Sequence, residues 1–298
     1  MKTEVQPLWT WPVSLLLAGA VLLGAHLWAG LAYRDHVEQQ LNLARLPATG
    51  GVVILGASKV RCGVLFDQEM AAALAARGQA VEVVRIARPA ALFGDFAPAF
   101  EALEAIPPRL VLLEADYLAL EPNPFRREGR PAALDWRNRA RAGLRAIALG
   151  DAAFKDTDTH DYNQPSTGSL ACVPRGTPRT LAEYAQDMSG RRTSTEGERR
   201  KVLARLLKLR ELGADIALVD TPRAPAAAAA FPPRLDREMR EVLRRGGEAN
   251  HLAVLAPPST LRAEHFLDTA HLNGPGRALY SAWLADQISA RLAAAPRR

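Results

Sequence analysis

Residues 50–58 read GGVVILGAS, a short apolar run that is rich in β-branched side chains and opens with two glycines. Such a run is typical of a strand that is buried on both faces of a parallel sheet. The pattern then alternates, with a helix expected over 65–78, a strand over 80–87, a helix over 93–106 and a strand over 108–120. Strands that alternate with helices predict an α/β fold, in which helices cover both faces of a parallel sheet.

The same alternation returns after a middle segment of different composition. Residues 122–195 are polar and rich in turn-forming residues, which favours an irregular insertion with short helices near 132–150. Beyond it the pattern predicts a helix over 195–213, a strand over 214–222, a helix within 226–247, a strand over 250–258 and a final helix over 277–295. The α/β domain is therefore expected to span residues 50–298.

The N-terminal segment has the composition of a membrane span. No Lys, Arg, Asp or Glu occurs from Val13 to Ala32, and about 20 apolar residues cross a bilayer as a helix. Trp11 and Trp28 lie at the two ends of this run, where aromatic rings prefer the membrane interface. We interpret residues 1–34 as a retained signal anchor, that is, a single transmembrane helix, with a cleaved signal peptide as the alternative.

A large domain behind a short anchored tail is expected to be exported. Residues 35–49 then form a charged linker at the inner membrane, and the rest of the chain lies in the periplasm or outside the cell. The formal net charge of +6 fits an anionic glycan or a membrane surface. No run of Lys and Arg interleaved with aromatic residues indicates nucleic acid. Cys62 and Cys172 are able to pair, but two cysteines predict neither a disulfide framework nor a cysteine metal site.

Two separate motifs point to one edge of the predicted sheet. Ser58 ends the first strand and precedes a helix, so its hydroxyl is expected at the carboxyl ends of the strands, where ligands bind. Residues 266–276 read FLDTAHLNGPG and follow the last strand, which places Asp268 and His271 at the same edge. An aspartate that holds one imidazole N–H leaves the other ring nitrogen free to take a serine proton. This convergence favours a hydrolytic triad, and Asn273 is expected to cap the final helix.

The stretches VVILGASKVRCG (52–63) and FLDTAHLNGPG (266–276) resemble the first and last sequence blocks of the SGNH/GDSL hydrolase superfamily. The resemblance implies a flavodoxin-like, SGNH-type doubly wound sheet. It also implies that Ser58 is the nucleophile, His271 the base and Asp268 the residue that orients the base. With its N-terminal anchor the chain is similar to exported members of this group, such as D-alanine transfer proteins and polysaccharide O-acyltransferases.

The oxyanion donors are where the chain departs from the family's pattern. The usual Gly-Asp-Ser is Gly56-Ala57-Ser58 here, a change that leaves the nucleophile in place. The resemblance implies that the backbone N–H of Ser58 is one donor. A glycine N–H is the second, and Gly94 is the nearest candidate, although this glycine fits the start of a helix equally well.

The third donor in the family is an asparagine that follows the third strand. At that place the chain reads LLEADYLALEPN, with Glu114 and Asp116 instead. A carboxylate that faces an oxyanion is repulsive unless it is protonated or turned away. The oxyanion hole is therefore built differently, with Asn123 as the alternative donor, or the protein is slow, specialised or inactive.

Two further charged motifs have a structural and a functional interpretation. Residues 155–163 read KDTDTHDYN, which resembles a metal loop or the Asp-x-His pair of alginate-type acetyltransferases. In those enzymes the pair precedes the serine, so we interpret this stretch as a solvated loop with no metal. Lys59 and Arg61 either bind an anionic substrate or are surface charges on the first turn of a helix.

Together these patterns predict an exported, membrane-anchored serine esterase or O-acyltransferase that acts on acyl esters of cell-envelope glycans. The proposed triad needs no metal or organic cofactor. By resemblance to its group, a transferase of this kind takes its acyl group from a multi-pass membrane acyltransferase. Two alternatives stay open: a catalytically inactive SGNH-like scaffold of the envelope, and a lipase or thioesterase that works close to the membrane.

Overall fold

A computed structural model describes residues 50–87, 91–121 and 180–294, together with Leu16, Ala20, Gly24 and Leu46. From Gly50 onward these residues belong to one compact unit. The predicted membrane anchor lies outside them, apart from three helical positions at residues 16, 20 and 24. Within the described part of the chain, no helix combines the length and the apolar character that a membrane crossing requires. The anchor and the linker that follows it stay predictions.

Five parallel strands form the sheet, in the order β2-β1-β3-β4-β5. Their bounds are β1 Val52–Gly56, β2 Val83–Ala87, β3 Leu110–Glu114, β4 Asp215–Val219 and β5 Ala253–Leu255. In register, Val52 of β1 lies beside Val83 of β2 and Leu110 of β3. This is the flavodoxin-like strand order. The chain adds β2 on one side of β1 and then β3, β4 and β5 on the other side, and all five strands stay parallel. The predicted parallel α/β sheet is confirmed.

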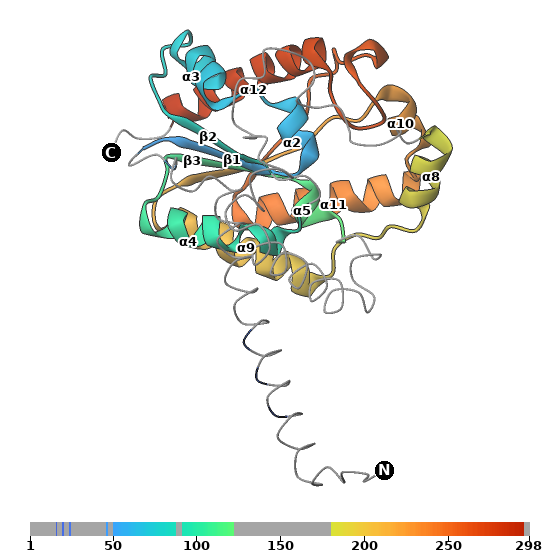
Figure 1. Cartoon of the computed structure of the whole chain (residues 1–298), viewed down its shortest axis with the longest axis horizontal. Helices are drawn as coiled ribbons and strands as arrows, with labels where there is room; N and C mark the ends of the chain where they lie inside the picture. Colours follow the sequence, from blue (N-terminus) through green and yellow to red (C-terminus); the bar gives the residue numbers. More distant parts are fainter. Residues whose placement is uncertain are drawn as a thin grey trace, which may run out of the picture. The chain divides into compact units, whose positions relative to one another are not determined.

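Helices cover both faces of this sheet (Figure 1). Their bounds are α2 Ser58–Gly63, α3 Asp67–Ala75, α4 Ala97–Ala105, α5 Asp116–Ala119, α8 Leu181–Ser189, α9 Glu196–Glu211, α10 Pro225–Ala230, α11 Pro233–Asn250 and α12 Gly274–Ala294, with 3-10 turns η2 Phe93–Phe96 and η5 Ala263–His265. Helices α3 and α12 contact each other on one face, while α4, α9 and α11 lie on the other. Fully buried side chains such as Ile54, Leu112 and Leu284 join the first face to the sheet.

The observed elements are shorter and more numerous than the sequence patterns predict. The strand expected over 108–120 ends at Glu114, and the short helix α5 follows it. Leu118 and Ala119 of α5 are buried, so the apolar run continues past the strand and hides its end. The predicted first helix is likewise preceded by α2, which begins at Ser58 itself. Of the predicted insertion, only the part from residue 180 is described, and it contains α8.

Local capping explains where α9 begins and ends. The Thr195 hydroxyl accepts from the N–H of Glu198, and the Glu198 carboxylate accepts from the N–H of Thr195 at 2.8 Å. This reciprocal capping box satisfies two N–H groups that have no partner inside the helix. Gly213 follows the helix with φ of 99°, a left-handed conformation that glycine adopts at least cost. The predicted helix over 195–213 is confirmed.

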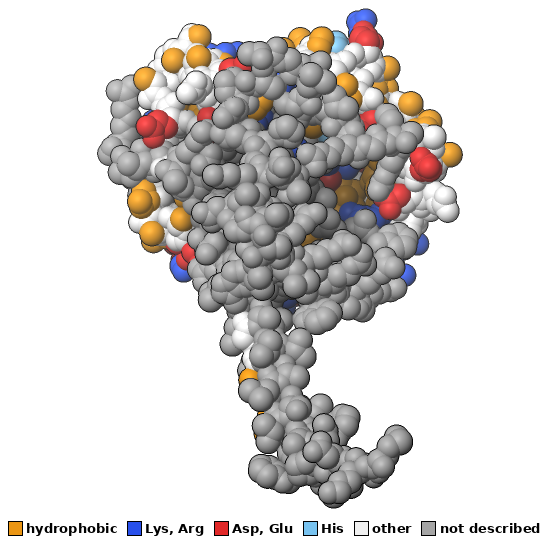
Figure 2. Space-filling view, viewed as in Figure 1, with side chains coloured by type: hydrophobic (Ala, Val, Ile, Leu, Met, Phe, Trp, Pro, Cys, Tyr) orange, Lys and Arg blue, Asp and Glu red, His pale blue; other side chains and the backbone are white. Residues whose placement is uncertain are grey.

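Positive and negative side chains are interspersed on the face shown in Figure 2. Many charges pair along one helix, as in Arg234 with Glu238 and Arg244 with Glu248 on α11. Exposed pairs of this type stabilise a helix by only about 0.3–0.5 kcal/mol each. Because of these pairs, the charges of α11 are balanced locally rather than gathered into one basic stripe.

Candidate active site

The candidate nucleophile Ser58 lies at the carboxyl end of β1, as the first residue of α2. The turn before it is tightly packed, because a Cβ atom on Gly56 would lie 2.2 Å from Cγ2 of Val60 and 2.9 Å from Oε2 of Glu114. A larger residue at position 56 would push against both neighbours. Ala57 adopts an extended conformation as the N-cap of α2, so the chain turns there and presents Ser58 at the edge of the sheet.

Ser58, His271 and Asp268 form one hydrogen-bonded chain. Nε2 of His271 lies 2.9 Å from Oγ of Ser58, although 213 positions separate the two residues in sequence. Nδ1 of His271 lies 2.8 Å from Oδ2 and 3.0 Å from Oδ1 of Asp268. The structure therefore brings the two predicted half-motifs into direct contact, in the order that acyl transfer by a serine requires.

Charge fixes the direction of this hydrogen-bonded chain. An ionised carboxylate can only accept, so Nδ1 of His271 carries the proton and Nε2 is left to accept from the serine hydroxyl. Burial raises the pKa of Asp268, but hydrogen bonds from His271 and from the N–H of Ala270 outweigh burial and hold this pKa below its usual value. The Asp268 side chain is 8% exposed and that of His271 is 21% exposed, so the imidazole is the more accessible of the two.

The loop that carries Asp268 and His271 is held by its own backbone. Oδ1 of Asp268 accepts from the N–H groups of Ala270 and His271, each at 2.8 Å. Asn273 then caps α12, because its Oδ1 accepts from the N–H of Gly276 at 2.9 Å. The stretch FLDTAHLNGPG is thus the entry to the last helix and also the carrier of the Asp–His pair, so the two interpretations of it are compatible.

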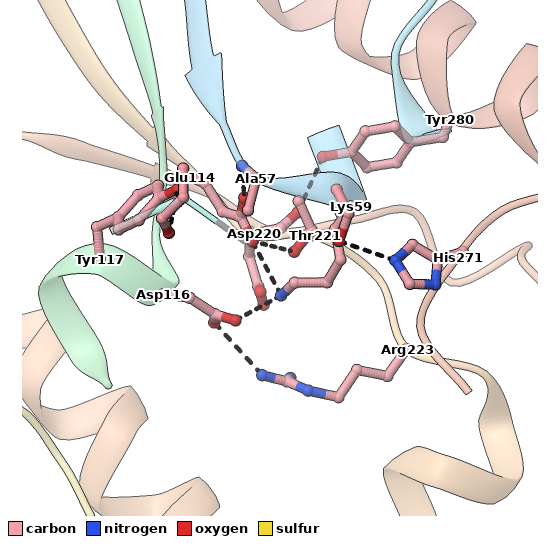
Figure 3. Close-up of polar contacts among 12 residues, drawn as sticks. Ala57, Lys59, Glu114, Asp116, Tyr117, Asp220, Thr221, Arg223, His271 and Tyr280 are labelled. Carbon is pink, nitrogen blue, oxygen red and sulfur yellow. Dashed lines mark hydrogen bonds and ion pairs between the residues drawn. The ribbon is translucent and has the colours of Figure 1, made fainter. Parts of the chain in front are cut away.

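A second polar cluster lies beside the nucleophile turn (Figure 3). Nζ of Lys59 lies 3.1 Å from Oε1 of Glu114 and forms an ion pair with Oδ2 of Asp116. The other oxygen of Glu114, Oε2, accepts from the N–H of Ala57 at 2.7 Å. Nη2 of Arg223, from the loop after β4, lies 3.5 Å from Oδ1 of Asp116. We call Lys59, Glu114, Asp116 and Arg223 the Lys59 cluster.

The Lys59 cluster changes the interpretation of its members. Glu114 and Asp116 turn toward cations and toward a backbone N–H, so neither carboxylate points its charge at the reacting hydroxyl. Burial lowers the pKa of Lys59, but the charges of Asp116 and Glu114 outweigh burial and raise it above its ordinary value. Burial raises the pKa of Asp116, and the charges of Lys59 and Arg223 outweigh it and lower that pKa. Lys59 is therefore not a surface charge, and that predicted alternative was wrong. Its binding of an anionic substrate stays a prediction.

No protein-family model matches this chain. No curated protein sequence matches it either. Among solved structures, the chain is similar to a GDSL-like lipase from Bacteroides thetaiotaomicron, with 13% identity and a TM-score of 0.39 over 87% of this chain and 99% of the other. It is also similar to a catalytic mutant of an acetylxylan esterase from Geobacillus stearothermophilus, with 13% identity and a TM-score of 0.37 over 80% of this chain and 95% of the other. A likeness this weak shows no family and carries no argument about activity, which has to be argued from the site.

The oxyanion role of Ser58 stays a prediction, like those of the other two candidates. As the first residue of α2, Ser58 has a backbone N–H with no acceptor inside the helix. Gly94 lies exposed in η2, and within the described ranges no hydrogen bond joins it to Ser58 or His271. Asn123 lies outside the described residues. The roles of Gly94 and Asn123 in an oxyanion hole stay predictions.

Other predicted features fall partly outside the structure. The loop 155–163 and Cys172 are not among the described residues, so neither the solvated-loop interpretation nor a pairing with Cys62 is tested. Counting only side chains that the structure does describe, no three His, Cys, Asp or Glu residues gather as a metal site would require.

Sequence reasoning missed Arg223 and the pairing of Lys59 with Glu114 and Asp116. One signal for the pairing was present: a lysine directly after the serine and two acidic residues at the end of a strand that reaches the same sheet edge. Arg223 offered no signal of this kind, because its loop carries no motif.

Proposed function

We propose that this protein is a serine acyl-ester hydrolase, with Ser58 as nucleophile, His271 as general base and Asp268 as the residue that orients the base. The observation that carries the proposal is the 2.9 Å contact between Nε2 of His271 and Oγ of Ser58, continued by the contact of Nδ1 with Asp268. A serine hydroxyl is a weak nucleophile unless an adjacent base takes its proton, and this geometry supplies the base.

The reaction follows from these positions in two steps. Oγ of Ser58 attacks the acyl carbonyl carbon while its proton passes to Nε2 of His271, and the N–H of Ser58 stabilises the oxyanion that forms. His271 then gives the proton to the leaving alcohol, which breaks the ester bond and leaves an acyl-serine. In the second step His271 takes a proton from water, and the resulting hydroxide attacks the acyl-serine carbonyl. The acyl–Oγ bond then breaks, His271 returns the proton to Oγ of Ser58, and the acid leaves. Asp268 stays ionised throughout and stabilises the imidazolium.

The same chemistry admits acyl transfer, in which a sugar hydroxyl takes the place of water. The sequence favours a role at the envelope, where the chain is anchored in the inner membrane and its α/β domain meets acylated glycans. Support comes from the uncharged run Val13–Ala32, in which Leu16 is helical and 75% exposed. A transferase in this location requires a supplier of acyl groups, for which a multi-pass membrane acyltransferase is the expected partner.

Glu114 and Asp116, which stand where the family has an asparagine after the third strand, were the best support for an inactive scaffold. Their pairing with Lys59, Arg223 and the N–H of Ala57 removes the repulsion on which that alternative rested. The active enzyme is accordingly the stronger of the two proposals.

Hydrolysis of short-chain p-nitrophenyl esters by the full-length protein tests the proposal. We expect Ser58→Ala to lower kcat on the order of 10⁴-fold or more. The matched control is Ser189→Ala, since Ser189 is an exposed serine at the end of α8 whose hydroxyl donates to the carbonyl of Gln186. A folded wild type without activity, or equal activity in Ser58→Ala, would contradict the proposal and favour the scaffold. Acetylated oligosaccharides then distinguish release of free acetate from transfer to a second sugar.

A further inference from the structure

Lys59 follows the nucleophile directly but shares no partner with it. The Ser58 hydroxyl contacts His271. The Lys59 ammonium instead contacts Glu114 and Asp116 (Figure 3). The side chain of Lys59 is 16% exposed and that of Glu114 is 2% exposed, so this pairing is largely shielded from water. The ammonium is already shared between two carboxylates and is poorly placed to take an anionic substrate as well.

Glu114 connects Lys59 to the backbone that positions the nucleophile. Its Oε1 faces the ammonium at 3.1 Å, and its Oε2 accepts from the N–H of Ala57 at 2.7 Å. Ala57 is the N-cap of α2 and immediately precedes Ser58. Gly56 lets the carboxylate approach, because a Cβ there would lie 2.9 Å from Oε2. One carboxylate therefore joins the end of β3 to the turn after β1.

The far end of the cluster is anchored on a third strand. Arg223 follows β4, lies 3.5 Å from Asp116, and holds its guanidinium carbon 4.5 Å from the centre of the Phe231 ring. Arg223 thereby compensates the second carboxylate that Lys59 contacts. The cluster ties together the carboxyl ends of β1, β3 and β4, the three central strands at the edge where Ser58 lies.

We propose that Lys59 is a positioning residue, which holds the Glu114 carboxylate against the N–H of Ala57 and so fixes the turn that presents Ser58 to His271. The inference rests on the proposed function, since it assigns Lys59 to the same reaction without contact to substrate. The physical reason is that a buried carboxylate needs a counter-ion. Without the ammonium, Glu114 and Asp116 repel each other at the end of β3, and Glu114 leaves the N–H of Ala57.

The test compares Lys59→Met with the wild type on a p-nitrophenyl ester, using the full-length protein. Displacement of a reacting group by about 1 Å can cost 10²-fold in rate, so we expect kcat to fall by about 10- to 100-fold while KM changes by less than about threefold. The matched control is Arg291→Met, which breaks a partly buried ion pair with Asp215 at the opposite end of β4. It should leave kcat within about twofold.

A local readout separates positioning from loss of stability. Hydrogen exchange, followed by mass spectrometry, should accelerate in the peptide that contains Ala57 in Lys59→Met, while exchange in α12 stays at the wild-type rate. If Lys59→Met does not fold, Glu114→Gln serves as the second variant, because it removes the ion pair while keeping the side-chain shape. In the double variant that combines Lys59→Met with Glu114→Gln, the loss of activity should match that of Lys59→Met alone, because Lys59 acts through Glu114.

Each outcome decides the inference. Wild-type kcat in a folded Lys59→Met, an unchanged exchange rate at Ala57, or additive losses in the double variant would overturn it. If the wild type hydrolyses no ester, the proposed function fails instead, and the exchange rate at Ala57 still decides whether Lys59 holds the turn.

Discussion

Ser58 and Lys59 are adjacent in the chain, yet their side chains enter two networks of different character. The network of Ser58 runs through an imidazole to a carboxylate, and in the proposed reaction the serine proton passes to the imidazole while Asp268 stays ionised. The network of Lys59 joins cations to carboxylates through ion pairs. A place beside the nucleophile does not give a residue a chemical role, because the partners of its side chain decide that role.

The two networks also differ in how their carboxylates are satisfied. Asp268 is bound by His271 and by two backbone N–H groups of its own loop, so its geometry is set locally. Glu114 and Asp116 depend on Lys59 and Arg223, which lie in the segments that follow two other strands, β1 and β4. Damage to the first network should therefore act on the chemistry, and damage to the second should act on structure and, through it, on rate.

The largest effect is expected when the proton path is cut. His271→Ala removes the base that contacts Oγ of Ser58, and kcat should fall on the order of 10⁶-fold. Steady-state hydrolysis of a p-nitrophenyl ester measures this loss, with His251→Ala as the matched control at the C-cap of α11, outside the site. A loss below about tenfold would show that the Ser58 network performs no catalysis.

Asp268→Asn should have a smaller effect, because an amide favours the wrong imidazole tautomer but leaves the base in place. We expect kcat to fall on the order of 10⁴-fold. The pKa of Asp268 is lowered, so the wild-type carboxylate stays ionised as the pH falls and protonates only below its ordinary value of about 3.9. Steady-state hydrolysis of a p-nitrophenyl ester at pH 8, where the Asp268 carboxylate is ionised, measures this loss. A loss below about tenfold would contradict the role of Asp268 in orienting the base.

Lys59→Met should affect folding stability more than any change in the Ser58 network. Loss of one partner from a buried ion pair costs about 3–5 kcal/mol, whereas Arg291→Met breaks a more exposed pair and should cost about 1 kcal/mol. Urea unfolding of the two variants measures the difference. Equal costs would mean that the Lys59 cluster is an ordinary surface ion pair.

The sign of the pH dependence follows from the pKa shifts of the cluster. The pKa of Lys59 is raised, so its contribution is present at neutral pH and is lost as the pH rises through the folded-state pKa. The pKa of Asp116 is lowered, so its contribution is present above the unfolded-state value and is lost as the pH falls through the folded-state pKa. The stability difference between wild type and Lys59→Met should therefore be flat from about pH 5 to pH 9 and shrink on either side.

The smallest effect concerns a third carboxyl group beside the cluster. Burial, followed by the charges of Asp116 and Glu114, raises the pKa of Asp220, so the folded state favours its protonated form. Its ionisation destabilises the fold as the pH rises through the folded-state pKa. Asp220→Asn should remove this penalty and stabilise the protein at pH 7, on the order of 0.5 kcal/mol. A lower unfolding midpoint in this variant would indicate an unrecognised favourable contact of Asp220.

Much of the fold was accessible from sequence because its signals are local. A few consecutive residues are enough to recognise the apolar run of β1, the caps of helix α9 and the turn at Asn273. The meeting of Ser58 with His271 followed from a general rule, that parallel strands bring their carboxyl ends to one edge. Both motifs follow predicted strands, so the contact between Ser58 and His271 could be predicted although 213 positions separate them in sequence.

The Lys59 cluster was not accessible in the same way. Whether Lys59 faces water or Glu114 depends on the direction of its side chain on α2. The sequence patterns did not predict α2 as a separate helix. With 38 Lys and Arg and 32 Asp and Glu in the chain, opposite charges alone do not identify partners. To predict the contact of Glu114 with Ala57, one has to know at which residue β3 ends. The apolar run that continues into α5 hides that end.

The most direct test of the account is covalent labelling of the full-length protein with a fluorophosphonate, followed by peptide mass spectrometry. We expect one adduct on the peptide that contains Ser58, absent from Ser58→Ala and formed at least about 10³-fold more slowly in His271→Ala. A folded wild type that forms no adduct, or a His271→Ala variant that labels at the wild-type rate, would contradict the claim that His271 activates Ser58.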